Sequence, residues 1–61
     1  MRVRFVKFVT SFGDGYVNPL NVLLVGARNG KVFVKMAGDL EFESSLPVAQ
    51  VIKLLEDAIS D

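Results

Sequence analysis

Three carboxylates recur at every second position late in the chain: Asp39, Glu41 and Glu43. If this segment is a strand, the three side chains share one face, and hard cations such as Ca²⁺ and Mg²⁺ bind such oxygen ligands. Metal-binding loops, however, normally curl around the ion, which a straight strand does not. A solvated strand face whose charges discourage edge pairing explains the same pattern. We therefore predict no metal site.

Two further patterns could serve phosphate binding or nucleophilic chemistry. The glycine-containing segment 13–15 leads into Asn18-Pro19 and a strand rather than into a helix, so we interpret it as a turn and not as a phosphate loop. Thr10 and Ser11 carry hydroxyl groups, but the chain contains no histidine and no cysteine to activate or replace them. We predict no catalytic residue, no cofactor and no enzymatic activity.

The charged residues divide between the two parts of the chain. Residues 1–36 carry six Lys/Arg and one Asp, a net charge of +5, whereas residues 37–61 carry one Lys and six Asp/Glu, a net charge of −5. One interpretation is that the basic residues, with aromatic rings nearby, hold an anionic nucleotide or single-stranded nucleic acid. The other is that basic and acidic strands pair with each other, within or between subunits. The candidate anion-binding residues are Arg2, Arg4, Arg28, Lys31 and Lys35.

Strands must position most of these side chains. The segment 3–9 is rich in Val and Phe, but its alternation is imperfect, which indicates a bulge near Lys7 or apolar contacts on both faces. The nearly apolar run Leu20 to Val25 predicts a strand buried on both faces. Asn29-Gly30 predicts a two-residue type I′ turn between strands near 21–27 and 32–36, because both turn residues need positive φ.

The remainder of the chain changes from strand to helix periodicity. Ala37 to Asp39 is predicted to turn the chain, and Leu40 to Glu43 then alternates, with Leu40 and Phe42 inward. Ser45 is the predicted N-cap of a helix with Pro47 in its first turn. The apolar stripe of this helix is Val48, Val51, Ile52, Leu55 and Ile59.

These elements predict the α+β class: one domain, residues 1–61, built as an antiparallel β-meander of three to four strands followed by one C-terminal α-helix. The 51% apolar content and 23% charged content exclude a disordered chain. No apolar run approaches the roughly 18–20 residues of a membrane span, and the alternating N-terminal segment lacks the core of a signal peptide. We expect a cytoplasmic protein without a membrane partner, since zero cysteines fit a reducing compartment.

The order of several short motifs resembles the small FlbD/SwrD-like proteins. The motifs are Gly15-Tyr16-Val17-Asn18-Pro19, an apolar strand with Val22 and Val25, the Asn29-Gly30 hairpin, and Ser45 before a helix with Val51-Ile52. The segment 36–43 adds a turn and a strand to that pattern. The resemblance implies a β-meander plus helix and a regulatory or interaction role. Similar short proteins occur in phage and prophage genomes, so a phage-encoded protein that acts on a host protein is the expectation.

The apolar residues predict that the chain forms a homo-oligomer, a dimer or higher. A fold of this size buries only about 60% of its unfolded surface, and neither disulfides nor the usual zinc ligands reinforce it. One helix covers one sheet face, supplied by Val22, Leu24, Val32, Val34, Leu40 and Phe42. The residues predicted to project from the other face into an oligomer interface are Leu23, Val25, Phe33, Phe5 and Phe8. The alternative is that the N-terminal strand covers that face internally.

Two functions follow from these observations. The first is a small non-enzymatic interaction or regulatory protein that acts as a homo-oligomer and binds or inhibits a host protein. The alternative is a small oligomeric module that binds an anionic nucleotide or single-stranded nucleic acid through its basic strand and hairpin residues.

Overall fold

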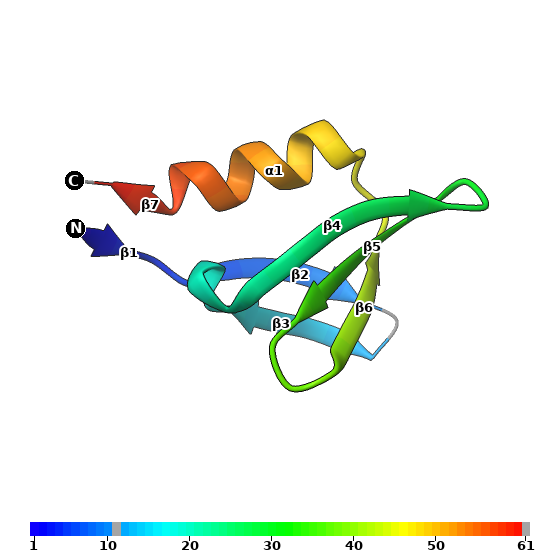
Figure 1. Cartoon of the computed structure of the whole chain (residues 1–61), viewed down its shortest axis with the longest axis horizontal. Coiled ribbons are helices and arrows are strands. Elements are labelled where there is room, and N and C mark those ends of the chain that lie inside the picture. The colour runs from blue at the N-terminus through cyan, green and yellow to red at the C-terminus, as the bar shows by residue number, and fades with distance from the viewer. Residues whose placement is uncertain (11, 61) are drawn as a thin grey trace.

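The computed structural model describes residues 1–10 and 12–60. Strands alternate with turns along most of the chain, and one α-helix lies near its end (Figure 1). In chain order the elements are β1 Arg2–Val3, β2 Val6–Thr10, β3 Gly13–Val17, the 3₁₀ turn η1 Pro19–Asn21, β4 Val22–Arg28, β5 Lys31–Met36, β6 Leu40–Ser44, α1 Val48–Asp57 and β7 Ile59–Ser60.

The central unit is the antiparallel meander β4–β5–β6, which confirms the predicted α+β class. Its first turn is formed by Asn29 (φ 56°) and Gly30 (φ 77°), both in the left-handed region that a type I′ turn requires. The second turn, residues 37–39, contains Gly38 and Asp39, also with positive φ. Both turns therefore lie where the sequence places them.

The N-terminal segment is not one strand with a bulge near Lys7. It breaks at Arg4 and Phe5: the short β1 pairs with β7, and β2 pairs with β3 in a separate hairpin of regular register from Val6↔Val17 to Thr10↔Gly13. The segment 13–15 therefore belongs to a strand, and the turn before it is shorter than predicted. Asn18 then caps η1, because its side-chain oxygen accepts a hydrogen bond from the Leu20 amide at 3.0 Å.

Strand β4 differs from the prediction in a way that changes which residues face the core. Its register shifts between Val22 and Leu24, so Val25 packs against the core while Leu23 and Leu24 are exposed. A one-residue shift moves every later side chain to the opposite face, because side chains alternate with a period of two. The prediction of a strand buried on both faces is therefore wrong, and Leu24 and Val25 exchange their predicted sides.

Helix α1 begins later and ends earlier than predicted. The N-cap is Pro47, not the predicted Ser45. In the preceding loop, the Ser44 hydroxyl accepts a hydrogen bond from the Leu46 amide at 3.2 Å. The buried positions of the helix are Val51 and Leu55, with Ala58 directly after it, whereas Ile52 is exposed. Ile59 lies in β7, not in the helix. The buried face thus keeps Val51 and Leu55 of the predicted stripe but has Ala58 in place of Ile52.

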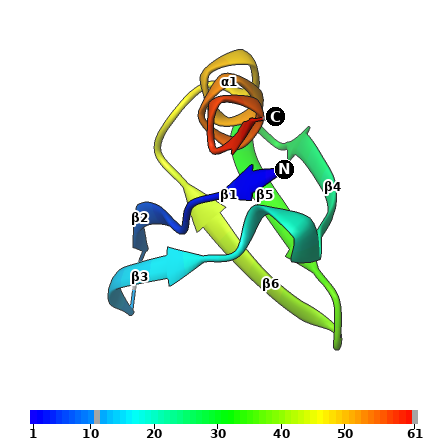
Figure 2. The ribbon, with the colours of Figure 1, turned by 90° about the vertical axis from the view of Figure 1, so that its left-hand side faces the viewer.

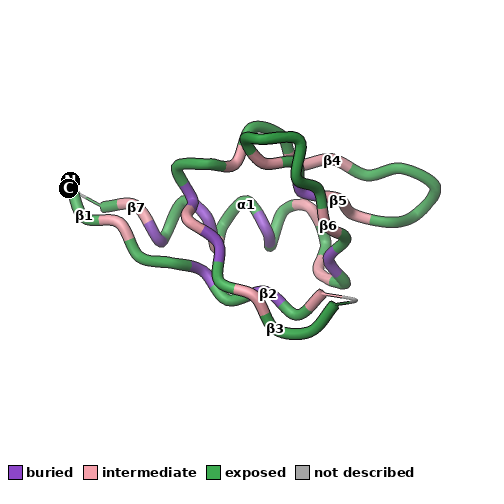
Figure 3. Tube along the Cα trace, turned by 90° about the horizontal axis from the view of Figure 1, so that it is seen from below, coloured by how far each residue is buried: buried purple, intermediate pink, exposed green. Residues whose placement is uncertain are grey.

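The core lies between the inner face of the meander, α1 and the β2–β3 hairpin (Figures 1 and 2). Phe8, Val34 and Val51 are its largest fully buried side chains, and the Phe8 ring lies 5.1 Å from that of Phe42, centroid to centroid. Leu40, predicted to point inward, is exposed. Buried residues cluster near the middle of the molecule, and the tip of the β4–β5 hairpin is exposed (Figure 3).

Candidate functional site

The outer face of the meander, opposite the core, gathers three of the five predicted anion-binding residues. The register places Leu24 opposite Lys35, Gly26 opposite Phe33, and Arg28 opposite Lys31. Since these positions alternate along both strands, Arg28, Lys31 and Lys35 surround Phe33 on one face. A shallow hollow of about 250 Å³ lies beside them, lined by Arg28, Asn29, Lys31, Phe33 and Glu43.

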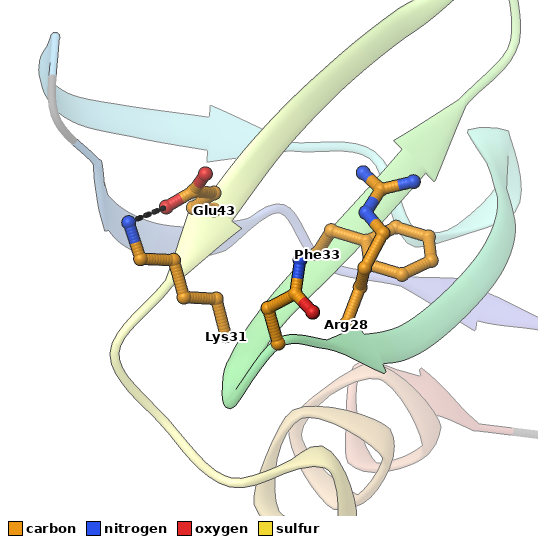
Figure 4. A pocket seen from close by; sticks show the side chains of 5 residues that line it. Arg28, Lys31, Phe33 and Glu43 are labelled. Carbon is orange, nitrogen blue, oxygen red and sulfur yellow. Dashed lines mark ion pairs between the residues drawn. The ribbon is translucent and has the colours of Figure 1, made fainter.

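Acidic side chains of β6 neutralise two of these cations. Arg28 forms an ion pair with Glu41 at 3.3 Å, and Lys31 forms one with Glu43 at 3.9 Å. The Arg28 guanidinium also lies over the Phe33 ring, 4.7 Å from its centroid (Figure 4). Basic and acidic strands thus pair within the chain, as one of the two interpretations predicts. The same contacts occupy the ring face on which a base would stack.

Arg2 and Arg4 do not join this group. Both lie in or beside β1, next to the helix end, whereas the Asn29-Gly30 tip lies at the opposite end of the long axis (Figure 1). The Arg4 Nη2 donates a hydrogen bond to the Asp57 carbonyl at 2.9 Å, and the Arg4 amide donates to the Ala58 carbonyl at 2.8 Å. Arg4 therefore ties the N-terminal segment to the end of α1. The five basic residues do not form one anion site.

The predicted interface residues also separate. Phe8 is buried in the core and Val25 packs against it, so the prediction that these two residues project into an oligomer interface is wrong. Leu23 and Phe5 are exposed, and Phe33 lies half-buried on the outer face of the meander. The bulge in β4 and the break before β2 account for these differences, because after each of them the side chains lie on the opposite face from the one predicted.

A second surface lies on the β2–β3 hairpin and the residue before it, and Phe5 is the one predicted interface residue within it. Four large apolar side chains are exposed there: Phe5 63%, Val9 66%, Phe12 92% and Tyr16 68%. We call these four residues the ribbon surface. Within β2 the period of two places Val9 on the face of Lys7, which pairs with Tyr16 across the hairpin, and Phe5 lies directly before this strand. The sequence signal was the imperfect alternation of residues 3–9.

A hollow of about 550 Å³ adjoins the ribbon surface at Val9. It opens between the end of β2, the start of β5 and the segment that leads into α1. Its apolar lining residues are Val9, Val32, Leu46 and Pro47. Ser44, Ser45 and Thr10 contribute hydroxyl groups, and the ion pair of Lys31 and Glu43 lies at its wall. This combination of an apolar concavity with a few polar groups suits the side chain of another molecule.

The other candidate chemistries have structural roles. Asp39 lies in a turn and Glu41 and Glu43 form ion pairs, and residues 1–10 and 12–60 contain no cluster of three acidic residues placed to hold a metal ion. Thr10 Oγ1 donates to the Gly13 carbonyl at 2.8 Å and accepts from the Phe12 amide, so it serves the β2–β3 turn. Ser11 lies outside the described residues. Within the described part of the chain, no helix is long and apolar enough to cross a membrane.

Comparisons of this chain with protein-family models, curated proteins and solved structures returned no match. The resemblance to FlbD/SwrD-like proteins therefore stays a prediction.

Proposed function

We propose that this chain is a small non-enzymatic interaction protein that forms homo-oligomers and acts by binding another protein. The observation that carries the proposal is the ribbon surface, where three aromatic rings and one valine are exposed on the β2–β3 hairpin and the residue before it. Aromatic side chains supply much of the binding energy of protein interfaces, and exposed clusters of them mark interaction sites.

The charge around the ribbon surface favours a protein over a nucleic acid. Lys7 is the basic residue between Phe5 and Val9, and it forms an ion pair with Asp14 at 3.4 Å. A nucleic-acid surface needs unpaired cations beside its aromatic rings, because phosphate contacts supply much of its affinity. The neighbouring hollow offers instead a site for an apolar side chain of a partner protein.

The test is native mass spectrometry of the protein isolated from the cells that produce it. We expect more than one copy of the chain together with a second protein. A Phe12→Ser/Tyr16→Ser variant should lose the second protein, because it removes two exposed rings without touching the core. A Gln50→Ser/Lys53→Ser variant on the exposed side of α1 is the matched control and should keep it. Retention of a small anion and no protein would contradict the proposal.

A further inference from the structure

Strand β4 is an edge strand of seven residues, and its other neighbour is the helix α1 rather than a strand. The strand order is β4–β5–β6, and β4 has no second strand neighbour within residues 1–10 and 12–60. A two-residue turn makes Arg28 and Lys31 a hydrogen-bonded pair, so Gly26 and Leu24 also bond to β5. The alternate residues, Val25 and Ala27, therefore direct their N–H and C=O groups away from the sheet.

This edge lacks two of the features that normally prevent edge-to-edge pairing, proline and charge, and its β-bulge lies at its start, between Val22 and Leu24. From Val22 to Ala27 it contains no proline and no charged residue. The other outer strand of the meander, β6, carries Glu41 and Glu43, and β3 carries Asp14 between two glycines. Three exposed leucines accompany the β4 edge: Leu20 51%, Leu23 68% and Leu24 52%. Among the strands of the described residues, β4 has the longest uncharged stretch, the six residues from Val22 to Ala27.

The accessible surface of the chain indicates how much area association could cover. The chain exposes 4436 Å², whereas a compact monomer of 6.7 kDa exposes about 3,900 Å². The excess is about 500 Å² per chain, or about 1,000 Å² for two chains, which is the lower limit for a stable specific interface. A second copy of this chain could therefore cover the excess through one contact of ordinary size.

We propose that a second copy of the chain adds its β4 antiparallel to this β4, so that two meanders form one six-stranded sheet about a two-fold axis. The proposal names the interface of the homo-oligomer and so rests on that part of the proposed function. Centred on Val25, the pairing places Leu24 opposite Gly26 of the partner subunit. Gly26 has no side chain, and Phe33 lies against it, so Leu24 meets an apolar ring there. The strand is thus complementary to itself, as a two-fold interface requires.

Sedimentation equilibrium over a dilution series tests the interface. We expect the mass of two chains for the natural sequence. For Leu24→Lys we expect a dissociation constant about 100-fold higher, because the two-fold axis places one new lysine from each subunit in the same interface. Leu40→Lys is the matched control: it is the same substitution at an equally exposed leucine on β6, away from the β4 edge, and it should leave the mass unchanged. Circular dichroism of both variants should match that of the natural sequence.

Amide hydrogen exchange gives a second, residue-specific readout. The Val25 and Ala27 amides should be protected at high protein concentration and exchange rapidly on dilution, since only the partner strand bonds to them. Ala27→Pro removes one of these outward donors, which an edge strand tolerates, and should also dissociate the dimer.

The outcomes separate this proposal from the proposed function. An oligomer that persists in both Leu24→Lys and Ala27→Pro, with unprotected Val25 and Ala27 amides, would overturn the β4 contact and leave the interaction role intact. A single chain at all concentrations would overturn the β4 contact and the homo-oligomer together. Binding of a second protein through the ribbon surface is measured separately, because β4 and the β2–β3 hairpin lie on opposite sides of the molecule (Figure 2).

Discussion

Gly26 determines how Phe33 lies on the outer face of the meander. A Cβ atom at Gly26 would lie 2.9 Å from Cζ of Phe33, closer than real Cβ contacts. The missing side chain thus lets the ring rest against β4, where Arg28 covers it. A glycine inside a strand often marks such a close approach. The place of Gly26 within an otherwise apolar strand is the sequence signal of this contact.

Gly30 is the residue whose replacement should damage the β4–β5 turn. Its φ of 77° is strained for any residue with a Cβ and most of all for a β-branched one. We expect Gly30→Val to lower the free energy of unfolding by about 2 kcal/mol, which thermal or urea denaturation measures. Gly15→Ala is the control, because a Cβ there has open space and no positive φ. Equal midpoints for the two variants would contradict this explanation.

At the scale of the elements, two irregular positions in the strands decide which side chains face the core. The bulge between Val22 and Leu24 exchanges the predicted sides of Leu24 and Val25, and the break at Arg4 and Phe5 separates β1 from β2. Each change involves one or two residues, but it moves the side chains that follow it to the opposite face of the strand. The surfaces that carry both proposals arise from these two irregularities.

The buried face of α1 provides a direct test of the core. Leu55 is 8% exposed and Ile52 is 38% exposed, although both belong to the stripe predicted from sequence. We expect Leu55→Ala to cost about 3 kcal/mol and Ile52→Ala about 1 kcal/mol or less in the free energy of unfolding. A domain of this size has a total of only about 3–5 kcal/mol from its core, so Leu55→Ala should lose most of its native circular dichroism signal. A larger loss from Ile52→Ala would contradict the observed helix orientation.

Local chemistry was predictable from sequence, and long-range register was not. Asn29-Gly30 and the turn at residues 37–39 lie where expected, because positive φ is a property of the residues themselves. The helix was expected from its apolar spacing, but its start depends on how Ser44 and Pro47 shape the preceding loop. Of the candidate site, Arg28, Lys31 and Phe33 were placed together by one hairpin. Phe8 and Val25 were misplaced because the break before β2 and the bulge in β4 depend on how these strands pair with the rest of the fold.

Across the whole molecule, opposite charges from the two parts of the chain meet at the surface. The two ion pairs on the meander have side chains that are 42–71% exposed, so each contributes about 0–1 kcal/mol and weakens with salt. Their larger effect is to cancel the positive field of Arg28 and Lys31. The charges of Arg28 and Lys31 beside Phe33 are therefore balanced by carboxylates of the same chain.

Removing the two carboxylates should reveal an anion-binding surface. We expect Glu41→Gln/Glu43→Gln to raise the affinity for a single-stranded oligonucleotide about tenfold or more at low salt, and the gain should vanish at high salt. Fluorescence anisotropy measures it. Glu56→Gln/Asp57→Asn makes the same change in net charge on α1 and should have a much smaller effect, because Arg28 and Lys31 lie elsewhere. Equal gains would show that net charge alone decides binding.

The pairing of β1 with β7 also determines how the molecule responds to mechanical force. Arg2 lies opposite Ser60 and Val3 opposite Ile59, and the Arg4 contacts with Asp57 and Ala58 follow directly. A force that pulls residues 2 and 60 apart loads these bonds one after another, as in opening a zipper, rather than all at once in shear. The ladder therefore yields at low tension and transmits the load to α1 before it reaches the meander. Tension at this end would strip the helix from the core while the Asn29-Gly30 hairpin stays folded.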